Sequence, residues 1–315
     1  MSNRIFFTAA AFALVLGTVA AGTCWAQQAP PEGVPAHLVV TAEPRKGSEV
    51  PVINRDDVMV FEGKDRDQVI DWVPAQGDHA ALQLFVMLDD GSNSTLGTQI
   101  EDIKKFINEQ PPSTAVGVAY MQNGIAKVEQ NPTTDHALAA KAIRLPMGMR
   151  GINGSPYFSL TDLIKRWPET TARREIFMAT DGIDRYYGIG DMLDPYLDEA
   201  INNAQRAGIL VSAIYTPGVG HFGHSYWQAY WGQLYLADLA DKTGGEAYYI
   251  GFSGPPVSFT PYLEQFSERL GHQYFLVFLA KPPKKPGLQR VRVRTEIQNV
   301  DLISAQQVYV APPAK

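Results

Sequence analysis

The chain of 315 residues has a single cysteine, Cys24. It lies in a leader that resembles a signal peptide, in which Arg4 precedes an apolar stretch (5–22) and a small residue, Ala26, stands at the expected cleavage point. If residues 1–26 are removed, the remaining chain has no thiol, which excludes disulfides, thiolate metal sites and cysteine catalysis. A lipid anchor on Cys24 is a lesser alternative, because the preceding residues 21–23 fit a lipid-attachment signal poorly.

Basic runs are also missing. The sequence has 33 acidic and 27 basic residues, a formal net charge of −6, and no basic run longer than two residues. This pattern argues against a nucleic-acid partner. No second long apolar segment follows the leader, so we expect no membrane span after signal removal. The expected location is outside the cytoplasm, whether periplasmic, at the cell surface or secreted.

The central region alternates between two patterns. Near-continuous apolar runs occupy 82–88, 115–121, 176–179, 209–215 and 247–252, as is typical of strands that are buried on both faces of a parallel sheet. The segments between them have helical periodicity, as in the stripe formed by Phe259, Leu263, Phe266 and Leu270. From about His79 to Gly271 the sequence therefore predicts an α/β fold, a doubly wound and mainly parallel sheet with helices on both faces.

Short β-type runs flank this region at 37–74 and 274–310. Neither segment is long enough for a robust core of its own. We therefore expect the N- and C-terminal segments to pair into one small β module, with the central domain inserted between its halves. The predicted organisation is a signal peptide (1–26), an N-terminal linker and β segment (27–78), the central domain (79–272) and a C-terminal β segment (273–315).

Polar residues stand at three places, two where predicted strands end and one where a predicted helix begins. The first apolar run leads into Asp90-Gly91-Ser92-Asn93-Ser94, a later one into Thr180-Asp181-Gly182, and Gly154-Ser155 precedes a helical segment. Carboxylate and hydroxyl oxygens are suitable ligands for a hard cation. Ligands in open α/β sheets bind at the carboxyl ends of the strands, which is where these residues are expected.

The Asp-x-Ser-x-Ser pattern and the two later loops, in this order, resemble the von Willebrand factor type A (VWFA) domain, which is Rossmann-like. The resemblance implies a metal-ion-dependent adhesion site that holds Mg²⁺, or Mn²⁺ or Ca²⁺. The family more often has Thr at the position of Ser155, and Thr161 is a rival for it inside the helical pattern. Asp89 stands where the family usually has an apolar residue. We interpret it as a carboxylate that caps its loop or supports the ligands of the cation; alternatively, as extra negative charge beside a cation, it tightens the site. The implied ligands are Asp90, Ser92, Ser94, Ser155 and Asp181.

A second stretch extends the resemblance. Leu239–Gly245, followed by Tyr248–Ile250, is similar to a subgroup of bacterial exported VWFA-related proteins. In that subgroup a short β segment precedes the domain and β strands follow it. The similarity covers nearly all of the chain after the leader, and it implies the fold and export rather than a particular ligand.

Two loops are expected to border the cation site. Arg185, Tyr186 and Tyr187 follow Asp181, and the segment 218–227 follows another strand. Both could contact a protein ligand. Alternatively, Tyr186 and Tyr187 pack on the sheet edge, and Tyr226 and Trp227 begin a helix and pack as core. The ligand-contact candidates are Arg185, Tyr186, Tyr187, His221, His224, Tyr226 and Trp227.

The predicted function is non-enzymatic, metal-dependent protein binding in adhesion or assembly. The VWFA resemblance implies that an acidic side chain of the partner completes the coordination of the cation. One alternative is a structural scaffold with the same fold and no working metal. Another is a metal-assisted hydrolase, but no general base stands out, and His136 is more simply the neighbour of a helix cap.

Overall fold

A computed structural model of the chain describes residues 33–45, 49–91, 94–148, 154–187, 194–217, 226–252 and 254–312. The expected signal peptide lies outside these residues. Contacts group Glu32–Lys315 into one unit, so the boundaries after residues 78 and 272 stay predictions. None of the helices within the described residues is long and apolar enough to cross a membrane.

The central sheet has six strands in the order β10-β9-β8-β5-β6-β7. The strands β5, β6, β8, β9 and β10 pair in parallel, and β7 joins the edge antiparallel to β6. Their bounds are β5 (Leu82–Asp89), β6 (Thr114–Gln122), β7 (Ile125–Thr133), β8 (Arg173–Thr180), β9 (Ile209–Tyr215) and β10 (Ala247–Tyr248).

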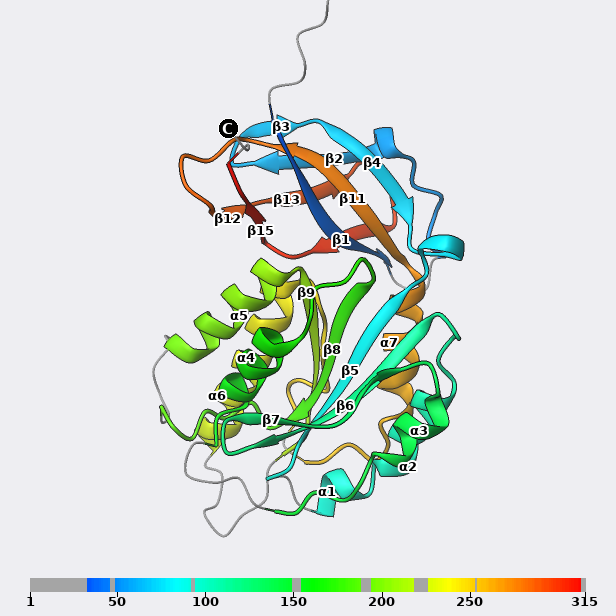
Figure 1. Ribbon diagram of the computed structural model, residues 1–315, viewed down its shortest axis with the longest axis vertical. Coiled ribbons are helices and arrows are strands. Elements are labelled where there is room, and N and C mark those ends of the chain that lie inside the picture. Colours follow the sequence, from blue (N-terminus) through cyan, green and yellow to red (C-terminus); the bar gives the residue numbers. More distant parts are fainter. Residues whose placement is uncertain are drawn as a thin grey trace, which may run out of the picture. The chain divides into compact units, whose positions relative to one another are not determined.

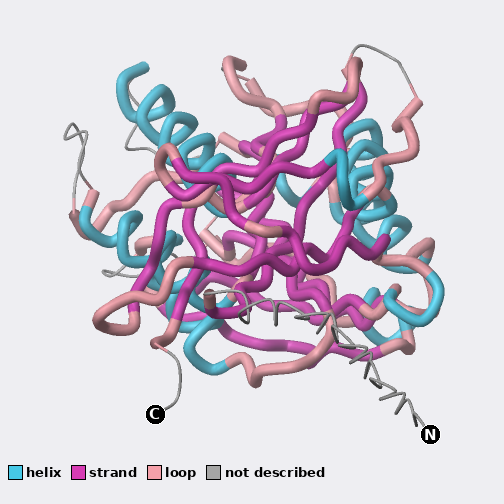
Figure 2. Tube along the Cα trace, turned by 90° about the horizontal axis from the view of Figure 1, so that it is seen from above, coloured by secondary structure: helices cyan, strands magenta, loops and turns pink. Residues whose placement is uncertain are grey.

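Helices cover both faces of this sheet (Figures 1 and 2). One core holds apolar residues of α2 (Ile100–Asn108), α3 (His136–Lys141) and α7 (Thr260–Gly271). The other holds those of α4 (Pro156–Arg166), α5 (Pro195–Ala207) and α6 (Tyr226–Thr243). Strand β5 contributes side chains to both cores, with Leu84 and Val86 in the first and Phe85 and Met87 in the second. The predicted doubly wound α/β class is confirmed.

The ends of α5 show how local sequence sets the helix bounds. Asp194 caps the amino end, where its side chain accepts hydrogen bonds from Tyr196 N and Leu197 N. Gly208 ends the helix with φ 63° and ψ 35°, a left-handed conformation that glycine adopts without steric cost. A short helix, α1 (Ser94–Gly97), precedes α2.

The flanking segments form a β module, as predicted. Strand β1 pairs antiparallel with β11 and β14, and β11 pairs with β4, so strands from both ends of the chain share one sheet. Strand β13 pairs with β2, and β2 with β3, while β12 pairs with β15. The module has its own apolar core. The strands are β1 (Val34–Pro44), β2 (Val58–Glu62), β3 (Asp65–Asp67), β4 (Val69–Pro74), β11 (Gln273–Ala280), β12 (Gly287–Arg290), β13 (Arg292–Thr295), β14 (Val300–Ser304) and β15 (Gln307–Val310), with 3-10 turns at Arg55–Asp57 and Gly77–His79.

Buried polar side chains join the module to the central sheet. Gln273, the first residue of β11, donates from Nε2 to Glu175 in β8 at 2.5 Å and receives a hydrogen bond from Arg173. Arg269 in α7 forms an ion pair with Glu43 in β1. Burial raises the pKa of Glu175 to about 7, although Arg173 and Gln273 favour its ionised form. A carboxyl group at this junction therefore titrates near neutral pH.

Three details differ from the sequence-based expectation. The edge strand β7 was not predicted, because its residues are mostly exposed or half-buried and form no apolar run. Its signal is the turn Asn123-Gly124, where both residues have positive φ, as two-residue hairpins require. The strand expected at 247–252 is only Ala247–Tyr248. The β-type segment at 274–310 is divided into several strands, with Val291 between β12 and β13 and a break between Ser304 and Gln307.

Candidate functional site

The two acidic loops lie side by side at one edge of the sheet. Strands β5 and β8 are parallel neighbours, with Leu88 opposite Ala179, so Asp90 and Asp181 follow the carboxyl ends of adjacent strands. Both carboxylates are buried, with exposed fractions of 0% and 1%. A buried carboxylate is costly unless a cation or hydrogen-bond donors compensate its charge.

Asp90 is compensated by three groups. Arg144 donates from Nη1 to Oδ1 at 2.6 Å and from Nη2 to Oδ2 at 3.2 Å, and Met147 N donates to Oδ1 at 3.0 Å. The side-chain amide of Gln122, at the end of β6, donates to Oδ2. Burial raises the pKa of Asp90, but the hydrogen bonds from Arg144, Gln122 and Met147 outweigh burial and place the pKa below its usual value. The carboxylate is therefore ionised at neutral pH.

Asp181 has a similar arrangement. Its Oδ1 accepts from Ile183 N at 3.1 Å and its Oδ2 from Arg185 Nη2 at 2.9 Å. Arg185 was predicted as a ligand contact, and in the structure it is the counterion of Asp181. The loop packs closely against α6 at Gly182 and Gly232. The two backbones are so near each other that a Cβ added to Gly232 would lie 2.2 Å from Asp181 O. Only glycine permits this approach, which fixes the first turns of α6 beside Asp181.

Ser155 caps α4 rather than standing free. Its hydroxyl oxygen accepts from Phe158 N at 3.3 Å, and its hydroxyl donates to Asp184 Oδ2 at 2.7 Å. Asp184 Oδ1 in turn accepts from Tyr186 N at 2.8 Å and Tyr187 N at 3.0 Å. Ser155 thus ties the start of α4 to the loop that follows Asp181. Its rival, Thr161, lies inside α4.

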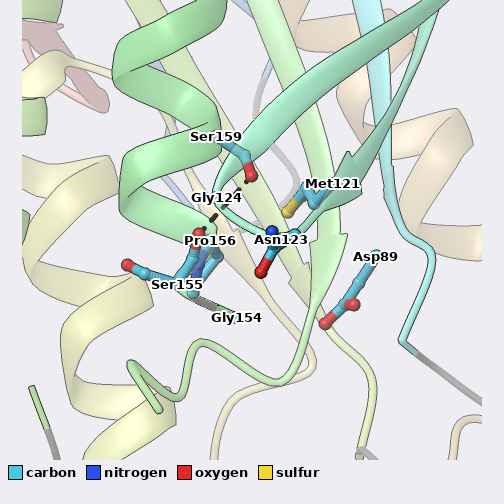
Figure 3. Close-up of a pocket in the computed structure, with 8 residues that line it drawn as sticks. All are labelled: Asp89, Met121, Asn123, Gly124, Gly154, Ser155, Pro156 and Ser159. Carbon is cyan, nitrogen blue, oxygen red and sulfur yellow. Dashed lines mark hydrogen bonds between the residues drawn. The ribbon is translucent and has the colours of Figure 1, made fainter. Parts of the chain in front are cut away.

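A small cavity adjoins these residues (Figure 3). Its volume is about 10 Å³, room for roughly one water molecule or ion. Asp89 borders it with 7% exposure, and its carboxylate accepts from Gly91 N at 2.8 Å and Thr180 Oγ1 at 3.0 Å. Asp89 therefore acts as a cap of its own loop, in agreement with one of its sequence interpretations. The lining residues are Asp89, Met121, Asn123, Gly124, Gly154, Ser155, Pro156 and Ser159.

The remaining predicted ligands do not enter this geometry. Ser92 lies outside the described residues, and so do His221 and His224; Ser94 begins α1, but its side chain is not described. Across the described ranges, no three His, Cys, Asp or Glu side chains are grouped as a metal site. The ligand chemistry suits a hard cation, yet the carboxylates of Asp90 and Asp181 each already form an ion pair with an arginine. A cation at Asp90 and Asp181 would have to displace Arg144 and Arg185.

The aromatic residues of the two loops are exposed to different degrees. Tyr186 and Tyr187 are 51% and 42% exposed, and both rings contact Tyr196 of α5. Tyr226 and Trp227 are 76% and 64% exposed. They begin α6, as one alternative predicted, but they do not pack as core. Figure 1 places the amino end of α6 at the same end of the sheet as the carboxyl ends of β5 and β8.

Sequence reasoning did not find Arg144 and Gln122. Arg144 follows α3 and is 54 residues from Asp90, and Gln122 is 32 residues from it. The available signal was indirect: a carboxylate expected at a buried strand end needs a cationic or polar partner. That signal does not identify which of the 27 basic residues supplies it.

No family model matches the chain, and no curated protein matches it. Among solved structures, it is similar to an aerotolerance-related membrane protein from Bacteroides fragilis that carries multiple mutations to serines. The two are 15% identical, over 60% of this chain and 98% of the other, with a TM-score of 0.43. The vWF domain of a type V pilus tip protein from Porphyromonas gingivalis is 11% identical over 60% and 94%, with a TM-score of 0.42.

A VWA-domain paralog of an ArnB protein from Sulfolobus acidocaldarius is 10% identical. The match covers 88% of this chain and 76% of the other, with a TM-score of 0.38. These similarities concern the fold alone. The doubly wound sheet of this chain follows independently from its own strand order, β10-β9-β8-β5-β6-β7.

Proposed function

We propose that this chain is an exported protein-interaction module whose binding face is the edge of the sheet where β5 and β8 end. The observation that carries the proposal is the pair of buried carboxylates, Asp90 and Asp181, on adjacent strand ends of one sheet. Exposed aromatic side chains stand at the start of the helix that packs against the Asp181 loop, and aromatic residues are enriched at protein interfaces. Export rests on the leader at 1–26.

We further propose that a divalent cation takes part in binding, with Mg²⁺ first and Mn²⁺ or Ca²⁺ as alternatives. Asp90 and Asp181 would hold it with the hydroxyl groups of Ser92, Ser94 and Ser155. A bound Mg²⁺ keeps exchangeable water ligands, one of which an Asp or Glu of the partner could replace. A cavity with room for one small occupant lies beside Ser155 and next to Asp89, and of the five proposed ligands Ser155 lines it.

A specific observation favours a second candidate, an interaction module or scaffold that works without metal. Arg144 and Arg185 each supply a guanidinium to one of the two carboxylates. An arginine of the chain can neutralise a carboxylate as a metal ion does. The bidentate contact of Arg144 with Asp90 is among the stronger hydrogen-bond geometries. In this case the same face binds the partner, with the two ion pairs serving only to hold the loops.

Hydrolysis by a bound cation is the remaining rival, and His136 does not support it. This side chain contacts Thr114 O through Nε2 at 2.8 Å. Thr114 is the first residue of β6, so His136 lies at the amino ends of the strands, away from Asp90. A general base must reach the proton that it removes, and His136 cannot do so at this site.

One experiment separates the two binding candidates. Wild type and Asp90→Ala are melted with millimolar Mg²⁺ and with chelator, and both proteins are used to capture partners from an extract of the source envelope. Metal-dependent binding predicts a gain of about 2.7 kcal/mol for wild type at a hundredfold excess of Mg²⁺ over its dissociation constant. Asp90→Ala should lose this gain and the capture.

The other outcomes are equally informative. Capture by wild type that is indifferent to chelator and to Mg²⁺ would refute the cation and support the metal-free candidate. Two results would show that the face at the carboxyl ends of β5 and β8 is not a binding face. In one, wild type captures no partner with Mg²⁺ or with chelator. In the other, a Trp227 variant captures the same partner as wild type.

A further inference from the structure

A larger cavity lies at the opposite end of the parallel strands, next to the first residues of β8 and β9. Its volume is about 380 Å³, within the range of small-molecule sites. Residues of the central domain line one part of it, including Ile209 and Leu210. Residues of β1 and β11 in the β module line another part, including Val39 and Phe275. The cavity is thus built jointly by the two ends of the chain and the central domain.

The first polar group in this cavity is a buried cation. Arg174 lines it with only 8% exposure. Its Nη1 donates to Pro168 O at 3.4 Å, its Nη2 donates to Ala207 O, and its guanidinium lies 5.8 Å from the Trp167 ring. No ion pair joins Arg174 to a carboxylate of the described ranges. Burial lowers the pKa of Arg174, with Glu169 opposing the effect only in part.

The second polar group is an unpaired acceptor. Gln205 also lines the cavity and is 3% exposed. Its Nε2 donates to Lys242 O at 2.6 Å, while its Oε1 is buried without a hydrogen-bond partner in the described part of the chain. Buried polar atoms are nearly always paired, so an orphaned carbonyl oxygen beside a cavity marks a position for a donor.

We propose that this cavity binds a small apolar molecule that carries one acidic group and one N–H or O–H donor. The acidic group pairs with the guanidinium of Arg174, and the donor pairs with Oε1 of Gln205. The apolar body contacts Leu38, Val39 and Phe275 on the side of the β module. Because the ligand touches both parts of the fold, it stabilises their junction. This site is separate from the proposed protein-binding face.

The probe for this proposal is 1-anilinonaphthalene-8-sulfonate, which combines aromatic rings, a sulfonate and an anilino N–H. We expect the native protein to bind it at one saturable site, measured by fluorescence titration. N-acetyl-phenylalanine, with a carboxylate, an amide N–H and one ring, should compete with it. Arg174→Gln should weaken binding about tenfold or more, since it removes a charge-assisted hydrogen bond, and Gln205→Met should also weaken it.

A third variant tests the cavity without touching either polar group. Ala172→Trp places an indole in the lining and should abolish dye binding while Arg174 and Gln205 stay in place. Phe252→Ala is the matched control, because Phe252 is 55% exposed and lies outside the lining; its dye affinity should equal that of wild type. The proposal is overturned if the native protein binds no dye saturably. It is also overturned if Ala172→Trp binds as wild type does, a comparison that holds even if Arg174→Gln fails to fold.

Discussion

The guanidinium of Arg144 holds the carboxylate of Asp90 with two hydrogen bonds, of 2.6 and 3.2 Å, across 54 residues of sequence. Asp90 is fully buried, whereas the Arg144 side chain is 29% exposed and lies over the Tyr120 ring, 3.8 Å from its centroid. The ion pair joins the end of β5 to the segment after α3. If a metal binds Asp90, as proposed, it must displace this ion pair.

Replacing Arg144 should therefore affect stability and metal response together. Arg144→Gln leaves the carboxylate of Asp90 buried without its cation, and we expect the free energy of unfolding to fall by about 3 kcal/mol. Millimolar Mg²⁺ should restore part of that loss if Asp90 is a metal ligand. Urea unfolding with and without Mg²⁺ measures both effects.

A matched control is the exposed ion pair between Arg45 and Asp301, whose side chains are 60% and 47% exposed. Arg45→Gln should change stability much less than Arg144→Gln, because solvent screens exposed pairs, and Mg²⁺ should not alter its stability. Equal losses in the two variants would contradict a special role for the Asp90 pair.

Glu175 predicts how stability depends on pH. Burial raises the pKa of this carboxyl to about 7 in the folded protein, above its value in the unfolded chain. The folded state then binds more protons between about pH 4.5 and 7. The contribution of Glu175 to stability is therefore complete below the unfolded pKa and is lost as the pH rises through the folded value.

The variant Glu175→Gln should remove this slope. Between pH 5 and 8 the free energy of unfolding should fall less for the variant than for wild type. The two decreases should differ by on the order of 3 kcal/mol at most. Denaturant unfolding at a series of pH values measures the two curves. Parallel curves for the two proteins would mean that Glu175 is not protonated in the folded state near neutral pH.

The exposed aromatic residues of α6 should contribute to partner binding and not to folding. Trp227 is 64% exposed, so Trp227→Ala should leave the melting temperature almost unchanged. If the residue is an interface anchor, the variant should lose about 2 kcal/mol or more of binding free energy, seen as lost capture of the partner. Tyr235, which is 6% exposed in the same helix, provides the contrast, because Tyr235→Ala should lower the melting temperature.

The contact between α6 and the Asp181 loop should tolerate no side chain. A Cβ at Gly232 would lie 2.2 Å from Asp181 O, so Gly232→Ala must move the helix or the loop, at a cost of about 1–3 kcal/mol. Gly254→Ala is the control, because an added Cβ there would meet nothing within 4 Å. Chemical denaturation compares the two, and a Gly232→Ala protein as stable as the control would exclude this close approach.

The fold could be predicted from the sequence because its strands and helices carry periodic signals. Strand β5 is almost continuously apolar, and its residues enter the cores on both faces. The apolar stripe of Phe259, Leu263 and Phe266 likewise reports a single face of α7. Strand β7 lacks this signal, since most of its residues are exposed or half-buried, and only its Asn123-Gly124 turn identifies it.

The site was less predictable, for a physical reason. Sequence motifs identify which polar residues follow strands, and Asp90 and Asp181 do lie where parallel strands end. They do not identify the counterions, since Arg144 reaches Asp90 only after the chain has passed through β6, β7 and α3. The role of Arg185 as the partner of Asp181 was likewise missed, although only four residues separate them. An arginine at that spacing can either extend into solvent or pair with the aspartate, and the sequence does not distinguish the two.

The pairing of Val34 with Ala280 in β1 and β11 has a consequence for how the protein is made. A ribosome adds about 5–20 residues per second, so β1 emerges roughly ten seconds or more before the strand that completes it. During that interval its backbone donors and acceptors form an unsatisfied strand edge, which is prone to pairing with other chains. The nascent chain thus has reason to depend on a chaperone until β11 has been made and can pair with β1.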